Sequence, residues 1–172
     1  MEEFEIRDAT KEDAALFAEY RFRMFVDMHP ETDFESRKKE FVRKSEVYYS
    51  GHLGSKDEYS CVVVVSERVV ACGSISFWDR PPHIDYFENN IGYVHSIYVR
   101  KEFRRRGISK AVMARLHEEA RKRGMRKVGL HSSESGRLVY KPMGYKGNDS
   151  YLEVERKRIN LRLVVLVNLE SF

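Results

Sequence analysis

The sequence predicts an α+β fold in which helices cover a mostly antiparallel β-sheet. Three observations support this prediction. Two amphipathic helical patterns occupy the amino-terminal part of the chain, two adjacent β-branched runs form a hairpin pattern, and a strand–helix–strand pattern follows. The helix of the last pattern is expected to cross over between two parallel strands. With 172 residues, 42% of them hydrophobic, the chain is long enough for one buried core, and we expect a single domain over residues 1–172.

Local signals define the elements of the first half. Alternating apolar and polar side chains mark a strand, and Thr10 with Asp13 marks the start of the first helix. Pro30 ends that helix because the residue before a proline disfavours helical geometry. We expect, in order, a strand at 4–9, a helix ending before Pro30, a helix at 33–49 and two antiparallel strands at 59–65 and 69–77.

The second half adds a parallel pair of strands and a final antiparallel pair. Ile108, Val112 and Leu116 lie on one helical stripe, and Gly124 is placed to cap the end of that helix. We expect a strand at 91–99, the helix beginning at Ile108, a strand at 128–131, a short helix at 137–141 and strands at 151–155 and 161–169. The complete order contains about seven strands and four helices.

The net charge of +4 hides an uneven distribution. The segment from Arg100 to Lys127 holds twelve basic and three acidic residues, whereas the remainder of the chain is mildly acidic. A net surplus of this size does not by itself indicate a nucleic-acid-binding protein. The concentrated positive charge indicates that an anionic ligand binds at this segment.

Other markers of protein class are negative. Met1–Glu5 lacks the basic and apolar regions of a secretory signal, and the apolar run at 163–167 is too short to cross a membrane. Cys61 and Cys72 each lie in an apolar run, which predicts reduced, buried thiols. The spacing of His and Cys residues does not suggest zinc, and we expect no metal. These observations favour a cytoplasmic protein.

A basic turn that contains glycine leads from the strand at 91–99 into the helix at Ile108. A helix amino terminus offers unpaired N–H groups and the positive end of the helix dipole. Gly107 allows close approach to the backbone, and arginines add charge-assisted hydrogen bonds to phosphate. The turn therefore predicts a site for a phosphate-bearing ligand. Neither the dinucleotide-binding fingerprint nor the P-loop spacing occurs in the chain.

Two motifs resemble those of the GNAT superfamily of acyl-CoA-dependent N-acyltransferases. Arg104-x-x-Gly107-x-Ser109 resembles the acetyl-CoA-binding motif Q/R-x-x-G-x-G/A. The segment 133–145, SESGRLVYKPMGY, resembles the later motif in which a helix carries a catalytic tyrosine. Ser109 replaces the usual Gly or Ala, and Ser133 stands where many members have a coenzyme-contacting Asn. The resemblance implies a GNAT-like fold with a twisted sheet and a β-α-β coenzyme-binding unit.

The resemblance implies an acetyl-CoA site that spans both motifs. In the family, the strand before the basic turn separates from its neighbour, and its free backbone groups receive the pantetheine arm and the thioester carbonyl. Residues of the turn hold the pyrophosphate. The implied coenzyme-binding residues are Ile97, Tyr98, Val99, Arg104, Arg105, Arg106, Gly107, Ile108, Ser109, Lys110, Ser133, Arg137 and Tyr140.

The resemblance also implies that an amine attacks the acetyl thioester directly through a tetrahedral intermediate. Tyr140 matches the tyrosine that protonates the departing thiolate. Some members carry a base at the strand positions held here by Tyr93 and His95, and imidazole, with an ordinary pKa of about 6.5, suits a base at neutral pH. The base is therefore His95, Tyr93 or water. Without a catalytic role, Tyr140 would be a tyrosine packed in the core and His95 a structural histidine.

Strand alternation adds a geometric expectation. Side chains two residues apart lie on the same face of a sheet, which places Tyr93, His95, Ile97 and Val99 together unless a bulge intervenes.

The acceptor and two alternative functions stay open. The reaction suits a small-molecule amine, a peptide N-terminus or a lysine side chain, and the acidic remainder of the chain favours a cationic acceptor. Arg21, Phe25, His29 and the loop at Pro82 are candidate acceptor contacts. The alternatives are a non-catalytic acyl-CoA sensor and, with less support, a basic nucleic-acid-binding protein. Dimerisation is common in the family, so a homodimer is also open.

Overall fold

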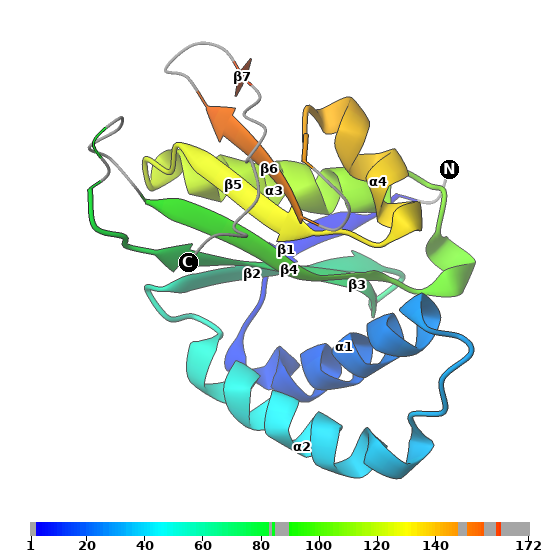
Figure 1. The fold of residues 1–172 in the computed structure, drawn as a ribbon. Helices are drawn as coiled ribbons and strands as arrows, with labels where there is room; N and C mark the ends of the chain where they lie inside the picture. Colours follow the sequence, from blue (N-terminus) through cyan, green and yellow to red (C-terminus); the bar gives the residue numbers. More distant parts are fainter. Residues whose placement is uncertain (1–2, 83, 85–89, 148–150, 157–160, 163–172) are drawn as a thin grey trace.

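The computed structural model describes residues 3–82, 84, 90–147, 151–156 and 161–162 of the chain (Figure 1). The α-helices in these ranges are α1 (Ala14–Met28), α2 (Glu35–His52), α3 (Ile108–Lys122) and α4 (Glu134–Tyr140). The strands are β1 (Glu5–Asp8), β2 (Glu58–Val65), β3 (Arg68–Trp78), β4 (Ile91–Val99), β5 (Lys127–His131), β6 (Tyr151–Arg156) and β7 (Leu161–Arg162).

The strands form one mixed sheet, in the order β1-β2-β3-β4-β5-β6-β7 within the described residues. Neighbouring strands are antiparallel except β4 and β5, which are parallel and are connected through α3. The predicted α+β class, the β2–β3 hairpin and the crossover helix are confirmed. Of the strand expected at 161–169, the structure describes only β7, and the remainder lies outside the described residues.

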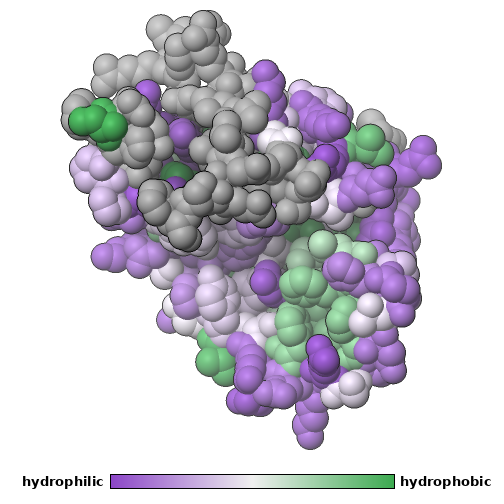
Figure 2. All heavy atoms as spheres, viewed as in Figure 1, coloured by the Kyte–Doolittle hydropathy of each residue, from purple (hydrophilic) through white to green (hydrophobic). Residues whose placement is uncertain are grey.

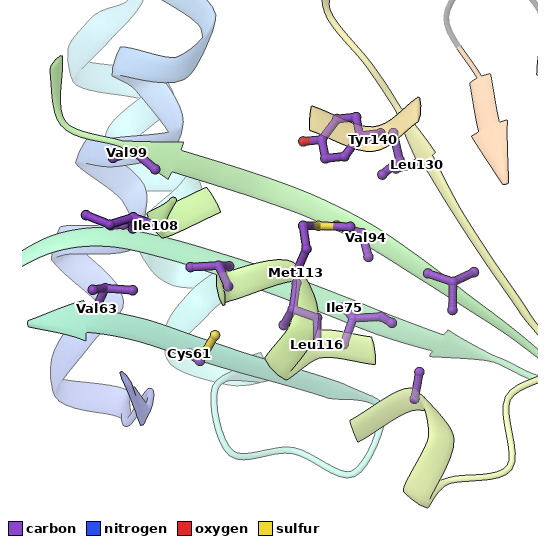
Figure 3. Packing of buried hydrophobic residues seen from close by; sticks show 14 of the residues in the cluster. Cys61, Val63, Ile75, Val94, Val99, Ile108, Met113, Leu116, Leu130 and Tyr140 are labelled. Atoms are coloured by element: carbon purple, nitrogen blue, oxygen red, sulfur yellow. The ribbon is translucent and has the colours of Figure 1, made fainter. Parts of the chain in front are cut away.

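Helices cover both faces of the sheet, with α1 and α2 on one face and α3 and α4 on the other (Figure 1). On the α3 face, Met113 and Leu116 belong to a buried cluster that includes Val63 of β2 (Figure 3). On the α1–α2 face, Val62 packs with Tyr49 in a second cluster. Val62 and Val63 are both fully buried because successive strand residues point to opposite faces, each covered by helices. Burial of such a side chain stabilises the fold by about 1.5–3 kcal/mol.

A β-bulge interrupts the regular alternation of β4. Ser96 and Ile97 together oppose a single residue of β3, Gly73, and Ser96 has a left-handed backbone with φ 56°. A Cβ atom on Gly73 would lie 2.5 Å from Val112 Cγ1 and 2.6 Å from Ile97 Cδ1. Glycine is therefore required where the bulge packs beneath α3.

The bulge makes the predicted common face of β4 wrong. His95 contacts the Ser96 hydroxyl, which in turn contacts Tyr49 of α2, so these side chains lie on the α1–α2 face. Ile97 and Val99 instead pack against the core on the α3 face. The extra residue shifts the alternation by one position after His95, and a bulge depends on the partner strand as well as on β4 itself.

The ends of two helices differ from the prediction. α2 continues to His52, three residues beyond the expected end. α4 begins at Glu134 rather than at Arg137, because the Ser133 hydroxyl accepts a hydrogen bond from the Gly136 N–H (3.1 Å) and caps the helix. None of the helices in the described ranges combines the length and apolar composition needed to span a bilayer.

Candidate active site

A cavity of about 1280 Å³ lies where β4 and β5 separate. The pairing of these two strands ends at Val94 and Leu130, so the backbone of β4 beyond Val94 has no described strand partner on the β5 side. We call the part of the cavity formed by residues 97–110 and α4 the turn end. The part formed by α1, α2 and the facing side chains of β3 and β4 is the helical end.

The turn end gathers most of the predicted coenzyme-binding residues. Those that line the cavity are Ile97, Tyr98, Val99, Arg104, Arg105, Gly107, Ile108, Ser109, Lys110, Ser133 and Tyr140. Two predicted residues, Arg106 and Arg137, are not among the lining residues, and the Arg106 guanidinium lies over the Phe103 ring, 5.1 Å from its centroid.

The turn before α3 presents backbone N–H groups to the cavity. The first hydrogen bond within α3 runs from the Ala111 N–H to the Gly107 carbonyl (3.1 Å), so the N–H groups of residues 108–110 have no partner inside the helix. Gly107 and Arg105 have left-handed backbones, with φ 80° and 64°. Glycine adopts this geometry without strain, which makes the sharp entry into the helix possible.

Arg104 fastens the turn to α1. Its guanidinium donates hydrogen bonds to Asp27 and, from Nε, to the Val99 carbonyl (2.9 Å). Lys101 also pairs with Asp27 at 2.9 Å. Burial alone would raise the pKa of Asp27, but the hydrogen bonds and charges of these two cations hold it below its ordinary value. The Asp27 carboxylate therefore remains ionised and ties the turn to the helical layer.

Tyr140 extends from α4 into the cavity. The residue is only 8% exposed, and its hydroxyl oxygen points away from Leu130 (Figure 3). Burial raises the pKa of Tyr140 to about 12, so the phenol is protonated at neutral pH. A Cβ atom on Gly136 would lie 3.0 Å from the Tyr140 ring, so the glycine leaves room for this ring orientation.

His95 belongs to a buried polar network at the helical end. Its Nε2 lies 2.9 Å from the Ser76 hydroxyl and 3.4 Å from a carboxylate oxygen of Glu58. Its Nδ1 lies 3.0 Å from the Ser96 hydroxyl. When Nε2–H donates toward Glu58, Nδ1 is the nitrogen that is able to accept a proton.

Glu58, at the start of β2, was not among the predicted site residues. It is 2% exposed and accepts hydrogen bonds from the hydroxyls of Tyr48 (2.7 Å) and Ser60 (3.2 Å). Burial acts to raise the pKa of Glu58, but its contacts with His95, Tyr48 and Ser60 lower it overall. A buried, ionised carboxylate therefore stands directly behind the imidazole.

Ser96, at the bulge, connects the network to both helices of the helical layer. Its hydroxyl accepts a hydrogen bond from Arg21 of α1 (2.7 Å) and lies 2.6 Å from the Tyr49 hydroxyl of α2. Tyr49 is fully buried, and burial raises its pKa to about 12. These contacts hold the strained backbone at Ser96, and Arg21 itself lines the cavity.

Tyr93, the other predicted base, is placed differently. Its hydroxyl lies 2.7 Å from Nδ1 of His131, and its ring stacks on Trp78 with centroids 5.2 Å apart. Burial raises the pKa of Tyr93, which disfavours the phenolate that a base would require. Tyr93 is thus better suited to forming the wall of the cavity than to accepting a proton.

The predicted acceptor contacts divide into two groups. Arg21 and Phe25 line the helical end of the cavity. His29 does not, and its Nδ1 instead lies 3.7 Å from Glu31. Pro82 is also absent from the lining, and most of the loop that follows it lies outside the described residues. In the described parts of the chain, no cluster of three or more His, Cys, Asp or Glu residues is placed to hold a metal ion.

The structure is similar to crystal structures of acetyltransferases over most of its length. A predicted acetyltransferase from Clostridium acetobutylicum, solved with acetyl-CoA, has 28% sequence identity and a TM-score of 0.72, with 86% of this chain and 92% of that chain covered. The PaiA N-acetyltransferase from Thermoplasma acidophilum, in complex with coenzyme A, shares the fold at 14% identity (TM-score 0.73, covering 90% and 99%). The fold and the divergent strands therefore define a protein of the acyl-CoA-dependent acetyltransferase class.

Sequence comparison gives the family. The model of the acetyltransferase (GNAT) family matches residues 18–145, and the chain belongs to this family. The resemblance seen in the two motifs is thus confirmed, and acyl-CoA-dependent acetyltransferase activity follows from membership. A search of curated proteins found no match to the chain.

Proposed function

We propose that this chain transfers the acetyl group of acetyl-CoA directly to a primary amine, within one domain over residues 1–172. The proposal is carried by one observation: His95, with the buried carboxylate of Glu58 behind it, and Tyr140 line the same cavity, which lies where β4 and β5 separate. Cys61 is buried outside the cavity lining, and burial raises its pKa to about 12. This environment disfavours an acyl-cysteine intermediate and favours direct transfer.

The turn end is proposed to hold acetyl-CoA. The N–H groups of residues 108–110 and the side chains of Arg105 and Lys110 would bind the pyrophosphate. The free backbone of residues 97–99 would receive the pantetheine arm and the thioester carbonyl. Arg104 is occupied by Asp27, so its proposed part is to fix the turn and add positive charge. Arg106 and Arg137 would contribute through charge rather than as lining contacts.

His95 is proposed as the general base. An amine with an ordinary pKa of about 10.4 is protonated at neutral pH, and neutralising it costs roughly 4 to 5 kcal/mol at about 1.36 kcal/mol per pH unit. His95 would take that proton at Nδ1, directly or through the Ser96 hydroxyl 3.0 Å away. Glu58 would stabilise the resulting imidazolium through its contact with Nε2 of His95, and it is therefore a positioning residue.

Tyr140 is proposed as the general acid. As the tetrahedral intermediate collapses, the C–S bond breaks and the thiolate of coenzyme A takes the phenolic proton. The proton lost from the acetylated nitrogen then restores the phenol of Tyr140. A thiol with an ordinary pKa of about 8.5 makes this the easier of the two proton transfers. The raised pKa of Tyr140 keeps its proton available throughout the neutral range.

A direct assay tests the proposal. The purified chain is incubated with acetyl-CoA and a broad panel of amines, and free coenzyme A is measured. We expect release that requires both acetyl-CoA and an amine, with the acetylated amine formed in equal amount. Saturable binding of acetyl-CoA without turnover on any amine would contradict the proposal and indicate the sensor alternative.

A further inference from the structure

Arg21 places a positive charge at the helical end of the cavity. Among the described residues, no carboxylate lies within ion-pair distance of it, whereas Lys44 at the same end pairs with Glu40 at 2.7 Å. A guanidinium has five N–H donors, and Arg21 uses one on the Ser96 hydroxyl. The remaining donors are able to bind an acidic group in the bidentate manner typical of arginine.

Arg21 also lies close to the proposed base. Its Nη1 is 2.7 Å and His95 Nδ1 is 3.0 Å from the same Ser96 oxygen, so the two nitrogens are no more than 5.7 Å apart. An acceptor whose only polar group is an ammonium would meet the like charge of Arg21 on its way to His95. Glu58 offsets this little, because it lies on the Nε2 side of the imidazole. An acidic group near the amine would turn this repulsion into a contact.

The walls of the helical end are largely apolar. The lining side chains of this kind are Met24, Phe25, Met28, Phe41, Tyr48 and Trp78. Met28 is 39% and Trp78 46% exposed, so apolar surface continues to the mouth of the cavity. The molecular surface also shows a hydrophobic area at the level of α1 and α2 (Figure 2). This environment favours an acceptor with an apolar or aromatic body.

We propose that the acceptor is an α-amino acid with an apolar or aromatic side chain. Arg21 binds its carboxylate, the amine faces His95, and the side chain packs against the apolar wall. This inference rests on the proposed function because it names the acceptor of that same reaction. It replaces the simple cationic acceptor favoured by the charge of the chain with a zwitterion, whose carboxylate pairs with Arg21 while its ammonium gives a proton to His95.

Matched pairs of acceptors test the inference. L-phenylalanine and 2-phenylethylamine differ by the carboxylate, as do L-leucine and 3-methylbutylamine. We expect kcat/KM to be at least about tenfold higher for the amino acid of each pair, which corresponds to about 1.4 kcal/mol. Arg21→Gln should bring each pair near parity by raising the KM of the amino acid. Binding of acetyl-CoA, measured by calorimetry, should stay within about twofold of wild type.

Two control variants separate the charge of Arg21 from its structural contact. Ser96→Ala removes the hydroxyl that Arg21 holds but leaves the guanidinium, so the preference for amino acids should persist even if the rates fall. Arg23→Gln removes a cation from the same helix that is paired with Glu19 (2.9 Å) and is absent from the cavity lining, and it should also preserve the preference. Loss of the preference in Arg23→Gln would overturn the assignment to Arg21.

The outcomes distinguish this inference from the proposed function. Equal or faster turnover of the amines that lack a carboxylate would overturn the inference and leave the acetyltransferase proposal standing. An equal fall in kcat for both members of each pair in Arg21→Gln would likewise overturn it. If no amine is turned over, calorimetric binding of L-phenylalanine to the coenzyme A complex, lost in Arg21→Gln, would support the subsite while the proposed function fails. Absence of that binding would overturn both.

Discussion

The two ends of the cavity are built in different ways. The turn end comes from two continuous segments, residues 97–110 and α4. Its main features are backbone N–H groups at the start of α3 and residues with left-handed backbones in the turn before it. The helical end is assembled from single side chains on separate elements, including Arg21, Glu58 and His95, joined by hydroxyls. In the proposed function, local backbone geometry would bind the coenzyme, and a network of side chains from separate elements would bind the acceptor.

Removal of the proposed base is the strongest test of the helical end. His95→Ala should lower kcat by about 10² to 10³, because general base catalysis typically contributes about 10² to 10⁴. The KM for acetyl-CoA should change little, since His95 lies at the other end of the cavity. Steady-state kinetics with both substrates varied measures this, and His29→Ala, outside the cavity, serves as a control expected to match wild type.

The turn end carries the second largest expected effect. Tyr140→Phe should lower kcat by about 10², toward the lower end for general acid catalysis because thiolate is a good leaving group. Acetyl-CoA affinity should be nearly unchanged. The matched control is Tyr145→Phe, which removes a hydroxyl 2.6 Å from His117 and should spare kcat while costing about 1 kcal/mol of stability. An unchanged kcat in Tyr140→Phe, with chemistry rate-limiting, would remove Tyr140 as the acid.

Glu58→Gln weakens the network without changing its shape. Loss of a charge-assisted contact worth about 1.5–2 kcal/mol should lower kcat by about 10- to 30-fold. The acidic limb of the kcat profile should move to lower pH, because a neutral amide no longer stabilises the proton on His95. A lower kcat with an unshifted profile would mean that Glu58 only supports packing.

A backbone change probes the turn end alone. Gly107→Ala introduces a Cβ atom into open space, so the cost is that of the left-handed conformation, about 1–2 kcal/mol. We expect the Kd of acetyl-CoA to rise about tenfold, while the preference among acceptors stays the same. A changed acceptor preference would show that the two ends are coupled.

The smallest expected effect concerns stability at acidic pH. The folded-state pKa of Glu58 is lowered, so its charge stabilises the fold above its unfolded-state pKa of about 4.3, and this stabilisation is lost as pH falls through the folded value. Urea denaturation between pH 6 and pH 3.5 should therefore show a steeper loss of unfolding free energy in wild type than in Glu58→Gln. Parallel curves for the two proteins would contradict the ionised state of Glu58.

The difference between the two ends also explains what could be predicted from the sequence. The turn end is local, so a glycine, a helix start and neighbouring arginines were sufficient to locate it. Glu58 was missed because it faces His95 only through the pairing of β2 with β3, and an irregularity between Val63 and Val64 shifts that register by one. Without this shift, the register next to the turn at Ser66 would place Glu58 opposite Ile75 instead of Ser76.

The bulge in β4 set a similar limit. Its position depends on Gly73 beneath α3 and on the hydroxyl contacts of Ser96, none of which the pattern of β4 contains. The order of the elements and the crossover were predicted correctly because they follow from local periodicity and chirality. The start of α4 was predicted three residues late because the helix is capped by the Ser133 hydroxyl, which accepts a hydrogen bond from the Gly136 N–H.

The most direct test of the account is the pH dependence of kcat for wild type and His95→Ala, measured side by side with one amine acceptor. We predict that wild-type kcat rises along an acidic limb and levels off well below the pH at which the acceptor amine itself ionises. In His95→Ala, kcat should be much lower and should keep rising with pH up to about pH 10, where the acceptor amine itself loses its proton. The same acidic limb and plateau in both proteins would contradict a His95–Glu58 base at the helical end.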